Sequence, residues 1–359
     1  MARSETVQDR RWSTVVWGAV PLVLLTGLLS FDHIPGTNIS LTVPYAAQGA
    51  GPMFDTLGEI AGEPVVRIDG AETDTTDGTL NMTTVSVRTN MTLPQAFGRW
   101  IATDDTLVPV EQVLPPDLND DEVREFNKRA FVASEASATV AAMRYLGRPT
   151  EVVVHDIVED SAAAGLLEAE DVILAANGRQ VTQPSEVQEV VGSLQPGDRL
   201  ELVLRRANAE RTVAVALGAD PDEDSKALLG VLMTSAPSGG VNVTYNLQDV
   251  GGPSAGMIFA LAVIDKLSPG ELTGGHVIAG TGTINDDGEV GPIGGIAHKI
   301  ASARDADVEL FLAPEGNCAD AARTNAGDMV VASVASLDDA IAAMEDFTAG
   351  REVATCRAS

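Results

Sequence analysis

A serine stands in a glycine-rich turn just ahead of a strongly apolar segment. Residues 251–256 read Gly-Gly-Pro-Ser-Ala-Gly, and residues 257–267 are apolar on nearly every side, which predicts a buried helix. Ser254 would then lie at the N-terminus of that helix, where unpaired backbone N–H groups and the helix dipole favour a developing oxyanion. The alternative is that Ser254 is an ordinary helix N-cap behind a Gly-Pro turn.

A lysine in apolar surroundings follows 45 residues later. Lys299 falls one turn into a predicted helix over residues 296–305, and its neighbours there are mostly alanine and isoleucine. The chain has four lysines and nineteen arginines, so it has used its rarer basic residue at this place. A buried lysine can lose its proton, whereas arginine effectively cannot. The alternative is a surface lysine whose aliphatic stem is buried, but arginine would serve equally well there, so the choice of lysine favours a general base.

Three glycine-containing blocks surround these two residues. They read GPSAG at 252–256, GTGTI at 280–284 and GPIGGIAHK at 291–299. Together they resemble the Lon-type serine peptidases, and the resemblance extends over residues 241–337.

The resemblance implies a Ser–Lys dyad in which Ser254 is the nucleophile and Lys299 is the general base. It also implies that Thr281 orients the lysine. The remaining implied contributions come from the nucleophile turn and oxyanion region, namely Gly252, Pro253 and Ala255.

Two positions depart from the family. The acidic residue that Lon enzymes have three places before the serine is Gly251 here, and Asp249 is near it but not aligned. The first lysine of the family's Lys-x-Lys pair is Ala297, which leaves Lys299 as the general-base candidate. An acidic third catalytic residue therefore stays an open question.

The chemistry requires Lys299 to be largely neutral so that it can accept the Ser254 proton. Lowering its reference pKa of about 10.4 by roughly three units costs about 4 kcal/mol, which burial without a counter-charge can supply. The serine would then attack a peptide carbonyl and form an acyl-enzyme that water hydrolyses. A Ser-His-Asp triad using His276 or His298 is the competing hypothesis, although His298 shares a helix with Lys299 and should face another way.

Two strands are expected to position the dyad. Residues 277–283 and 289–293 predict a strand pair, joined by a turn at Asp287-Gly288. The first strand would carry Thr281, and the second would lead into the helix of Lys299.

A compact second unit is predicted over residues 150–217. Its expected elements are strands at 151–157 and 171–175, a helix at 186–194 capped by Ser185, and a hairpin of 200–204 with 212–217. This order, with SAAAGL at 161–166, DVIL at 171–174 and Asn177-Gly178, resembles a bacterial PDZ domain. Glu170 stands where that family usually has glycine. The resemblance implies capture of an extended peptide beside the helix, and a scaffold that binds no free peptide is the alternative.

The N-terminal region predicts one membrane-spanning helix. Residues 13–31 carry no charge and, at about 1.5 Å per residue, would extend roughly 28 Å, close to the thickness of the hydrocarbon layer. Three arginines precede this run and Asp32 follows it, which predicts a cytoplasmic tail, a single span and an extracytoplasmic body at the cell membrane. A cleaved signal peptide is the alternative, but the run is long and small residues first cluster at Ala46.

Residues 64–90 alternate in short β-prone pieces and contain GTLNMTTV at 78–85. With the anchor, the PDZ-like unit and the Lon-like unit, nearly the whole chain resembles the YlbL-like family of bacterial membrane-anchored proteins. We therefore predict that residues 64–90 pair with the peptidase sheet, so that the PDZ unit is an insertion in a split domain.

The expected fold class is α+β: an N-terminal transmembrane helix, a PDZ domain built as a small β-barrel or sandwich with helices, and a Lon-type α/β proteolytic domain. Residues 36–60, rich in glycine and proline, suggest an extended lead-in, and residues 117–147 predict a helix. The predicted divisions are a tail and anchor (1–35), a β-rich segment and helical connection (36–130), the PDZ domain (131–218), an acidic linker (219–230), the proteolytic domain (231–347) and a C-terminal tail (348–359).

Composition restricts the partners. The net charge of −29 argues against nucleic acid, because phosphate contacts need a basic face. Two cysteines and four widely spaced histidines argue against a metal centre, and no cofactor is expected. The sequence contains no Walker A motif, so we expect action without ATP on protein or peptide substrates. The family suggests a homo-oligomer, a hexameric ring, by analogy. A different class of function is a catalytically silent PDZ adaptor on a Lon-like assembly fold.

The two cysteines lie on the predicted outer side, where disulfides persist. We predict one bond between Cys318 and Cys356 that holds the C-terminal tail. Closing this ring stabilises the fold by about 4 kcal/mol in the chain-entropy description. Two free thiols are the alternative.

Overall fold

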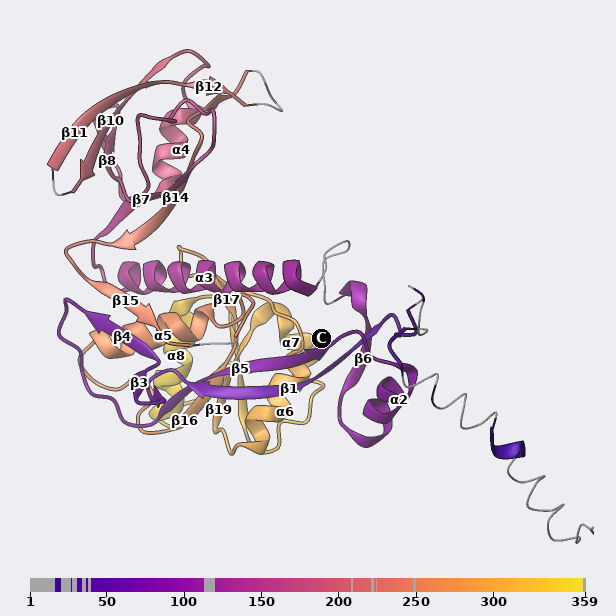
Figure 1. Cartoon of the computed structure of the whole chain (residues 1–359). Coiled ribbons are helices and arrows are strands. Elements are labelled where there is room, and N and C mark those ends of the chain that lie inside the picture. The colour runs from indigo at the N-terminus through magenta and orange to yellow at the C-terminus, as the bar shows by residue number, and fades with distance from the viewer. Residues whose placement is uncertain are drawn as a thin grey trace, which may run out of the picture. The chain divides into compact units, whose positions relative to one another are not determined.

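The computed structural model describes residues 17–20, 27, 31–33, 37, 40–112, 120–207, 209–220, 223, 225–247 and 250–357 (Figure 1). The chain divides into two compact units, Met1–Pro52 with Thr84–Val123 and Met53–Thr83 with Arg124–Ser359. Strands β1 (Tyr45–Asp55) and β5 (Thr79–Arg88) contribute residues to both units.

In the first unit, β1 pairs antiparallel with β6 (Thr106–Pro109), and η1 (Val110–Gln112) follows. The extended lead-in expected over 36–60 thus contains a regular strand, β1, in which the small residues Ala46, Ala47 and Gly49 are buried. Helix α2 (Leu93–Ala102) was not predicted from the sequence; its N-cap is Thr92, which forms a capping box with Gln95.

A parallel sheet forms the centre of the second unit, in the order β20 (Val330–Val334), β19 (Leu310–Pro314), β16 (Val277–Gly280) and β5. Thr79 of β5 pairs with Val277 of β16, and β4 (Val66–Asp69) pairs antiparallel with β15 (Asn242–Tyr245). Residues 64–90 thus join strands from beyond the PDZ unit, as predicted. The short strands β2 (Glu59–Ile60) and β3 (Glu63–Pro64) form a turn between β1 and β4.

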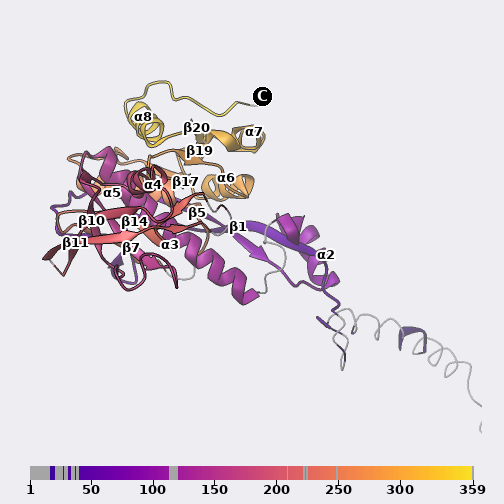
Figure 2. The same ribbon diagram turned by 90° about the horizontal axis from the view of Figure 1, so that it is seen from above.

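Helices cover both faces of this sheet. On one face, the buried core is shared by α5 (Gly256–Leu267), α8 (Leu337–Thr348) and the long helix α3 (Asp120–Tyr145) (Figures 1 and 2). On the other face, α6 (Ile296–Asp305) and α7 (Cys318–Ala321), which follows η2 (Glu315–Asn317), pack on the alternate side chains of β19. The predicted helices over 257–267 and 296–305 are confirmed to within one residue.

The PDZ-like sheet runs in the order β11 (Ala209–Ala216), β10 (Arg199–Arg206), β8 (Val172–Ala176), β7 (Thr150–Ile157) and β14 (Val231–Pro237). It has its own core, which includes α4 (Pro184–Gly192). Beside this path, β9 (Arg179–Gln180) pairs with β8, and β12 (Gly218–Ala219) pairs with β13 (Ala227–Leu228).

Three boundaries differ from the sequence prediction. β14 had been assigned to the proteolytic domain, but it pairs along β7, so the PDZ sheet continues past the acidic linker. The part of α3 from residue 131 was predicted to belong to the PDZ domain, and its buried side chains lie in the core that also contains α5 and α8. Gln183 rather than Ser185 caps α4, because Pro184 already occupies its first turn.

Cys318 and Cys356 form a disulfide with Cα atoms 4.8 Å apart. Of the predicted anchor over 13–31, the structure describes residues 17–20, 27 and 31, and the rest lies outside the described residues. Among the residues that the structure does describe, no helix has the length and apolar character of a membrane span.

Candidate active site

Ser254 lies at the start of α5, in a turn that the local glycines permit. Gly252 has φ +88°, a left-handed conformation that glycine adopts without strain. Gly256 is packed so closely that a Cβ there would lie 2.6 Å from Ser134 Oγ and 2.8 Å from Ile284 Cγ2. The turn can therefore approach the neighbouring segments only because these positions lack side chains.

Lys299 reaches Ser254 from α6. Its Nζ lies 2.8 Å from Ser254 Oγ and donates to Thr281 Oγ1, also at 2.8 Å. Thr281 Oγ1 in turn donates to the backbone carbonyl of Ser254 at 3.0 Å. The structure thus brings together the three residues that the sequence selected for nucleophile, base and orienting hydroxyl.

The environment of Lys299 favours the neutral amine. The side chain is only 1% exposed, and burial lowers the pKa of Lys299 to about 7. Within the described part of the chain, no carboxylate forms an ion pair with it. Because its partners are hydroxyls, nothing offsets the cost of burying a charge, and the proton is readily lost near neutral pH.

Two backbone N–H groups beside Ser254 have no hydrogen-bond acceptor among the described residues. Among the described residues, no acceptor bonds the N–H of Ala255 or Gly256, and no side chain caps α5. The Met257 N–H, by contrast, donates to Gly282 O at 3.1 Å. The helix N-terminus can therefore stabilise a negative oxygen next to the serine hydroxyl.

The segment carrying Thr281 differs from its predicted form. A single strand was expected over 277–283, but β16 ends at Gly280, and the following β17 (Thr283–Ile284) pairs with β18 (Val290–Gly291) instead. The break has a local cause, since Gly282 N–H donates to Ser254 O at 2.9 Å. The chain thus leaves the sheet to contact the nucleophile turn.

Helix α3 also supports the turn, which the sequence did not reveal. Ser134 Oγ donates to Pro253 O at 3.0 Å, and the Gly252 N–H donates to Asn127 O at 2.9 Å. Phe131, between them, packs edge-on against Phe259 of α5. These residues belong to no recognisable motif and precede Ser254 by more than a hundred positions, so only the fold brings them to the site.

Glu135, also on α3, is a half-buried carboxyl. Burial raises the pKa of Glu135 to about 7, in the same range as Lys299. Burial raises the pKa of Tyr245, and the negative charge of Glu135 adds to that shift, while the hydrogen bond with Thr139 Oγ1 at 2.7 Å acts against it. Glu135 is thus a second group that titrates near neutral pH in the peptidase core.

The alternative base candidates lie elsewhere. His276 Nδ1 bonds Glu309 Oε2 at 2.9 Å and packs against Phe347, not Ser254. The imidazole of His298 makes no hydrogen bond within the described part of the chain, where only its backbone N–H donates, to Gly295 O at 3.1 Å. Gly251 packs against Asn127, Ala297 is exposed, and Asp249 lies outside the described residues.

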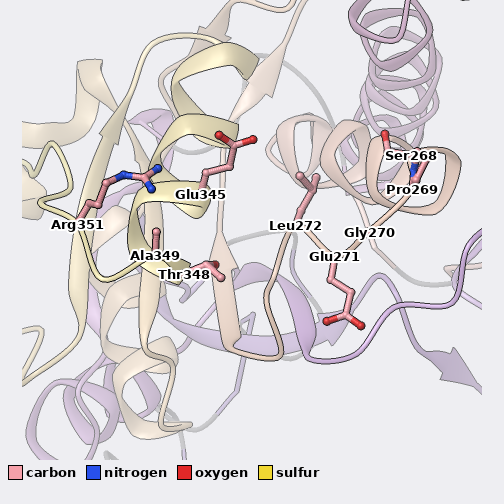
Figure 3. Close-up of a pocket in the computed structure, with 9 residues that line it drawn as sticks. All are labelled: Ser268, Pro269, Gly270, Glu271, Leu272, Glu345, Thr348, Ala349 and Arg351. Atoms are coloured by element: carbon pink, nitrogen blue, oxygen red, sulfur yellow. The ribbon is translucent and has the colours of Figure 1, made fainter.

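A separate cavity of about 420 Å³ lies at the other end of α5 (Figure 3). Its lining comes from the loop after α5 and from the end of α8, including Glu271, Glu345 and Arg351. Because α5 has 12 residues and so extends about 18 Å, this cavity is distinct from the Ser254 site.

Two protein families match parts of the chain. Residues 119–217 match the PDZ domain, and residues 241–344 match the Lon protease (S16) C-terminal proteolytic domain. The second match contains Ser254, Thr281 and Lys299, whereas the α3 residues that support the turn precede it.

Curated relatives are similar over a smaller part. A "probable periplasmic serine endoprotease DegP-like" of Pseudomonas savastanoi pv. phaseolicola is 33% identical over 93 residues, which is 26% of this chain and 19% of that protein. The protein of the same description from Pseudomonas fulva is 32% identical over 94 residues, 26% of this chain and 20% of that protein. The matched region thus spans about a fifth of these relatives. The chain thus combines a match to the PDZ domain with a match to the Lon protease C-terminal proteolytic domain, and it is similar to these endoproteases over about a quarter of its own length.

Solved structures are also similar to a part of the chain. The PDZ domain of an SdrC-like protein from Listeria innocua is 26% identical, with a TM-score of 0.22, covering 23% of this chain and 92% of that one. A solution structure from Geobacillus thermodenitrificans is 28% identical, with a TM-score of 0.21, covering 23% and 94%.

Proposed function

We propose that this chain, which combines a PDZ domain with a Lon protease C-terminal proteolytic domain, is a serine endopeptidase with a Ser254–Lys299 dyad. One observation carries the proposal: the buried Lys299 amine lies 2.8 Å from Ser254 Oγ and has hydroxyl partners rather than a carboxylate. A structural lysine at this depth would be expected to have a counter-ion.

The reaction begins with neutral Lys299. Its lone pair accepts the proton of Ser254 as the serine oxygen attacks a peptide carbonyl, and the N–H groups of Ala255 and Gly256 stabilise the resulting oxyanion. The protonated lysine then gives its proton to the departing amine. Water hydrolyses the acyl-enzyme by the same transfers in reverse. Thr281 keeps the amine aligned throughout.

The rest of the chain places this chemistry. In the proposal, residues 13–31 anchor the protein in the cell membrane by a single span, with the tail cytoplasmic and the body outside. The PDZ domain captures protein substrates or regulates access to the dyad. The peptidase acts without ATP or another cofactor, as a homo-oligomer for which the family suggests a hexameric ring.

Labelling of the full chain with a fluorophosphonate probe tests the proposal. The probe should attach to Ser254, and Ser254→Ala should not react. The labelling rate should rise with pH up to about 7 and level off above it, because protonated Lys299 cannot accept the serine proton. The Glu135→Gln variant should keep this profile, which assigns the titration to Lys299 rather than to the other group of similar pKa. A folded wild-type chain that resists labelling at every pH would indicate the silent adaptor instead.

A further inference from the structure

Helix α2 presents an apolar face to its surroundings. Leu93, Phe97, Trp100 and Ile101 are each between 53% and 64% exposed. At 100° per residue they fall within an arc of about 100° on one side of the helix. Phe97 and Trp100 lie side by side with ring centroids 6.1 Å apart, so the exposed surface is continuous.

The helix is held through a neighbouring side, because Ala96 lies about 90° around the helix from the centre of the apolar face. Ala96 packs with Ala47 and Met91 in a small core, to which Val43 and Leu107 add. The four large side chains are therefore not needed to attach α2 to its own unit. A soluble surface rarely leaves so many large apolar residues together, so this face calls for a partner.

The charge around α2 points to the kind of partner. Residues 78–103 contain no Asp or Glu, although the chain has 52 acidic residues in all. Two arginines, Arg88 and Arg99, are the charged residues of this stretch, and Arg99 pairs at 3.0 Å with Asp105, which lies just beyond α2. In a protein of net charge −29, this acid-free segment avoids the repulsion that anionic headgroups exert on acidic side chains.

A chain of backbone contacts joins α2 to the point where the uncharged N-terminal run ends. The Leu41 N–H donates to Asp32 O at 2.8 Å, and Asp32 is the first charged residue after that run. The next residue, Thr42, pairs with Thr92, the N-cap of α2. Two cross-strand steps and one step along the chain span roughly 15 Å, so α2 begins close to Asp32.

We propose that the α2 face formed by Leu93, Phe97, Trp100 and Ile101 lies in the outer interfacial layer of the bilayer, beside the membrane anchor. This inference rests on the proposed anchor over 13–31. Trp and Phe are residues that favour the boundary between headgroups and acyl chains, and an amphipathic helix lies there in the plane of the membrane. The anchor and α2 would then hold the first unit at the membrane by two contacts.

Fluorescence of Trp100 in the full chain tests this placement. In the Trp12→Phe/Trp17→Phe variant, Trp100 is the remaining tryptophan. The chain is reconstituted in vesicles of phosphatidylcholine and phosphatidylglycerol, and also at one copy per nanodisc. Trp100 emission should shift to the blue, be quenched severalfold by lipids brominated near the headgroup, and be protected from aqueous iodide. The matched control replaces all three tryptophans by Phe and introduces Leu232→Trp, on an exposed β14 position of the PDZ sheet, which iodide should quench.

Each other result overturns the inference. If the chain floats with the vesicles but Trp100 behaves like the control, the anchor stands and the α2 placement is wrong. If Trp100 is protected from iodide but is not quenched by the brominated lipid, another protein surface covers it. The same conclusion follows if Trp100 is protected in vesicles but not at one copy per nanodisc. If the chain does not float at all, the proposed anchor fails together with this inference.

Discussion

Lys299 in the peptidase core and Asp171 in the PDZ sheet are both buried ionisable side chains, but they have different partners. Lys299 has two hydroxyls within hydrogen-bond distance. Asp171 is fully buried, and the Arg206 guanidinium donates to both of its oxygens at 2.6 Å, while the Glu168 N–H donates to one of them. The Lys299 site has no opposite charge to stabilise a protonated amine, whereas Asp171 and Arg206 form a buried pair of opposite charges.

The pKa values follow from this difference. Burial lowers the pKa of Lys299 to about 7. Burial alone would raise the pKa of Asp171, but the hydrogen bonds and charge of Arg206 outweigh it, and the pKa lies below its usual value. In the proposed mechanism the uncompensated site holds a reactive neutral amine, whereas the compensated site holds a fixed ion. Both side chains are buried, so the partners rather than the depth of burial make Lys299 the candidate base.

The two sites also affect stability in opposite pH ranges. Between about 7 and the ordinary lysine value, the folded state binds less proton at Lys299 than the unfolded state, so its contribution to stability rises with pH there. Asp171 contributes fully above the ordinary aspartate pKa, and its contribution is lost as pH falls through the lower folded value.

The largest expected effect is on the peptidase side. Lys299→Arg keeps a positive charge but cannot supply a neutral amine, because arginine stays protonated in proteins. We expect peptide cleavage and probe labelling to fall by about 10²–10⁴-fold, the usual value of base catalysis. The double variant with Ser254→Ala should be no worse than either single variant, because the two residues act as a unit.

Lys266→Arg is the matched control for this substitution. Burial also lowers the pKa of Lys266, but Asp55 and Asp265 act against that shift, so this lysine resembles the compensated type. Its replacement should leave the labelling rate nearly unchanged. Substantial activity in a well-folded Lys299→Arg protein would show that Lys299 is not the general base, and its lack of a counter-charge would then have no catalytic meaning.

The next largest effect is on the PDZ side. Asp171→Asn removes the buried charge and leaves Arg206 without its main partner, which should cost about 3–5 kcal/mol of local stability. Hydrogen exchange in β10, which carries Arg206, should increase strongly while that of α5 stays slow. Labelling of Ser254 at a temperature where the peptidase core is folded should not change.

Glu168→Gln is the control that distinguishes the buried Asp171–Arg206 pair from an exposed ion pair made by the same arginine. Glu168 also contacts Arg206 but is exposed, and exposed ion pairs contribute about 0–1 kcal/mol. It should therefore change exchange in β10 only slightly. Equal effects of Asp171→Asn and Glu168→Gln would show that the buried pair has no special role.

Local pattern was sufficient to predict the core of the candidate site. The glycine turn, the apolar helix behind Ser254 and the scarcity of lysine around Lys299 are all visible within short windows of sequence. The break between β16 and β17 was not, because Gly282 leaves the sheet for a hydrogen bond to Ser254, 28 residues before it. Tertiary contacts here override a continuous β-prone run.

The role of α3 and the extent of the PDZ sheet could not be predicted for a related reason. Helical periodicity identified a helix over 117–147 but did not show which core it joins. β14 follows an acidic segment that looks like a domain boundary, yet it pairs with β7 over 70 residues earlier in the chain. Sequence proximity favours the wrong neighbour in both cases.

Ser134→Ala tests the contribution of α3 to the uncompensated site. Losing the hydrogen bond to Pro253 O should cost about 0.5–1.5 kcal/mol of turn alignment, which corresponds to a roughly 2–10-fold slower labelling rate. Ser137→Ala, on the same helix but without a described hydrogen bond, is the control and should label normally. If both variants label like the wild type, the dyad does not depend on α3.

The smallest expected effect concerns the loop that precedes Asp171. Glu170 has φ +70°, where a residue with a Cβ loses roughly 1–2 kcal/mol and glycine does not. Glycine also increases the entropy of the unfolded chain, which costs about 0.5–1 kcal/mol and offsets part of this relief of strain. Glu170→Gly should therefore stabilise the PDZ sheet by up to about 1 kcal/mol, which hydrogen exchange would show as slower exchange in β8. Glu170→Ala keeps the Cβ and should show no such gain. Glu170→Gly leaves the Asp171–Arg206 pair intact, so its gain in stability and the loss caused by Asp171→Asn should add in the double variant. If the Glu170→Gly protein instead loses no stability on Asp171→Asn, backbone strain rather than the buried charge pair governs the stability of this region.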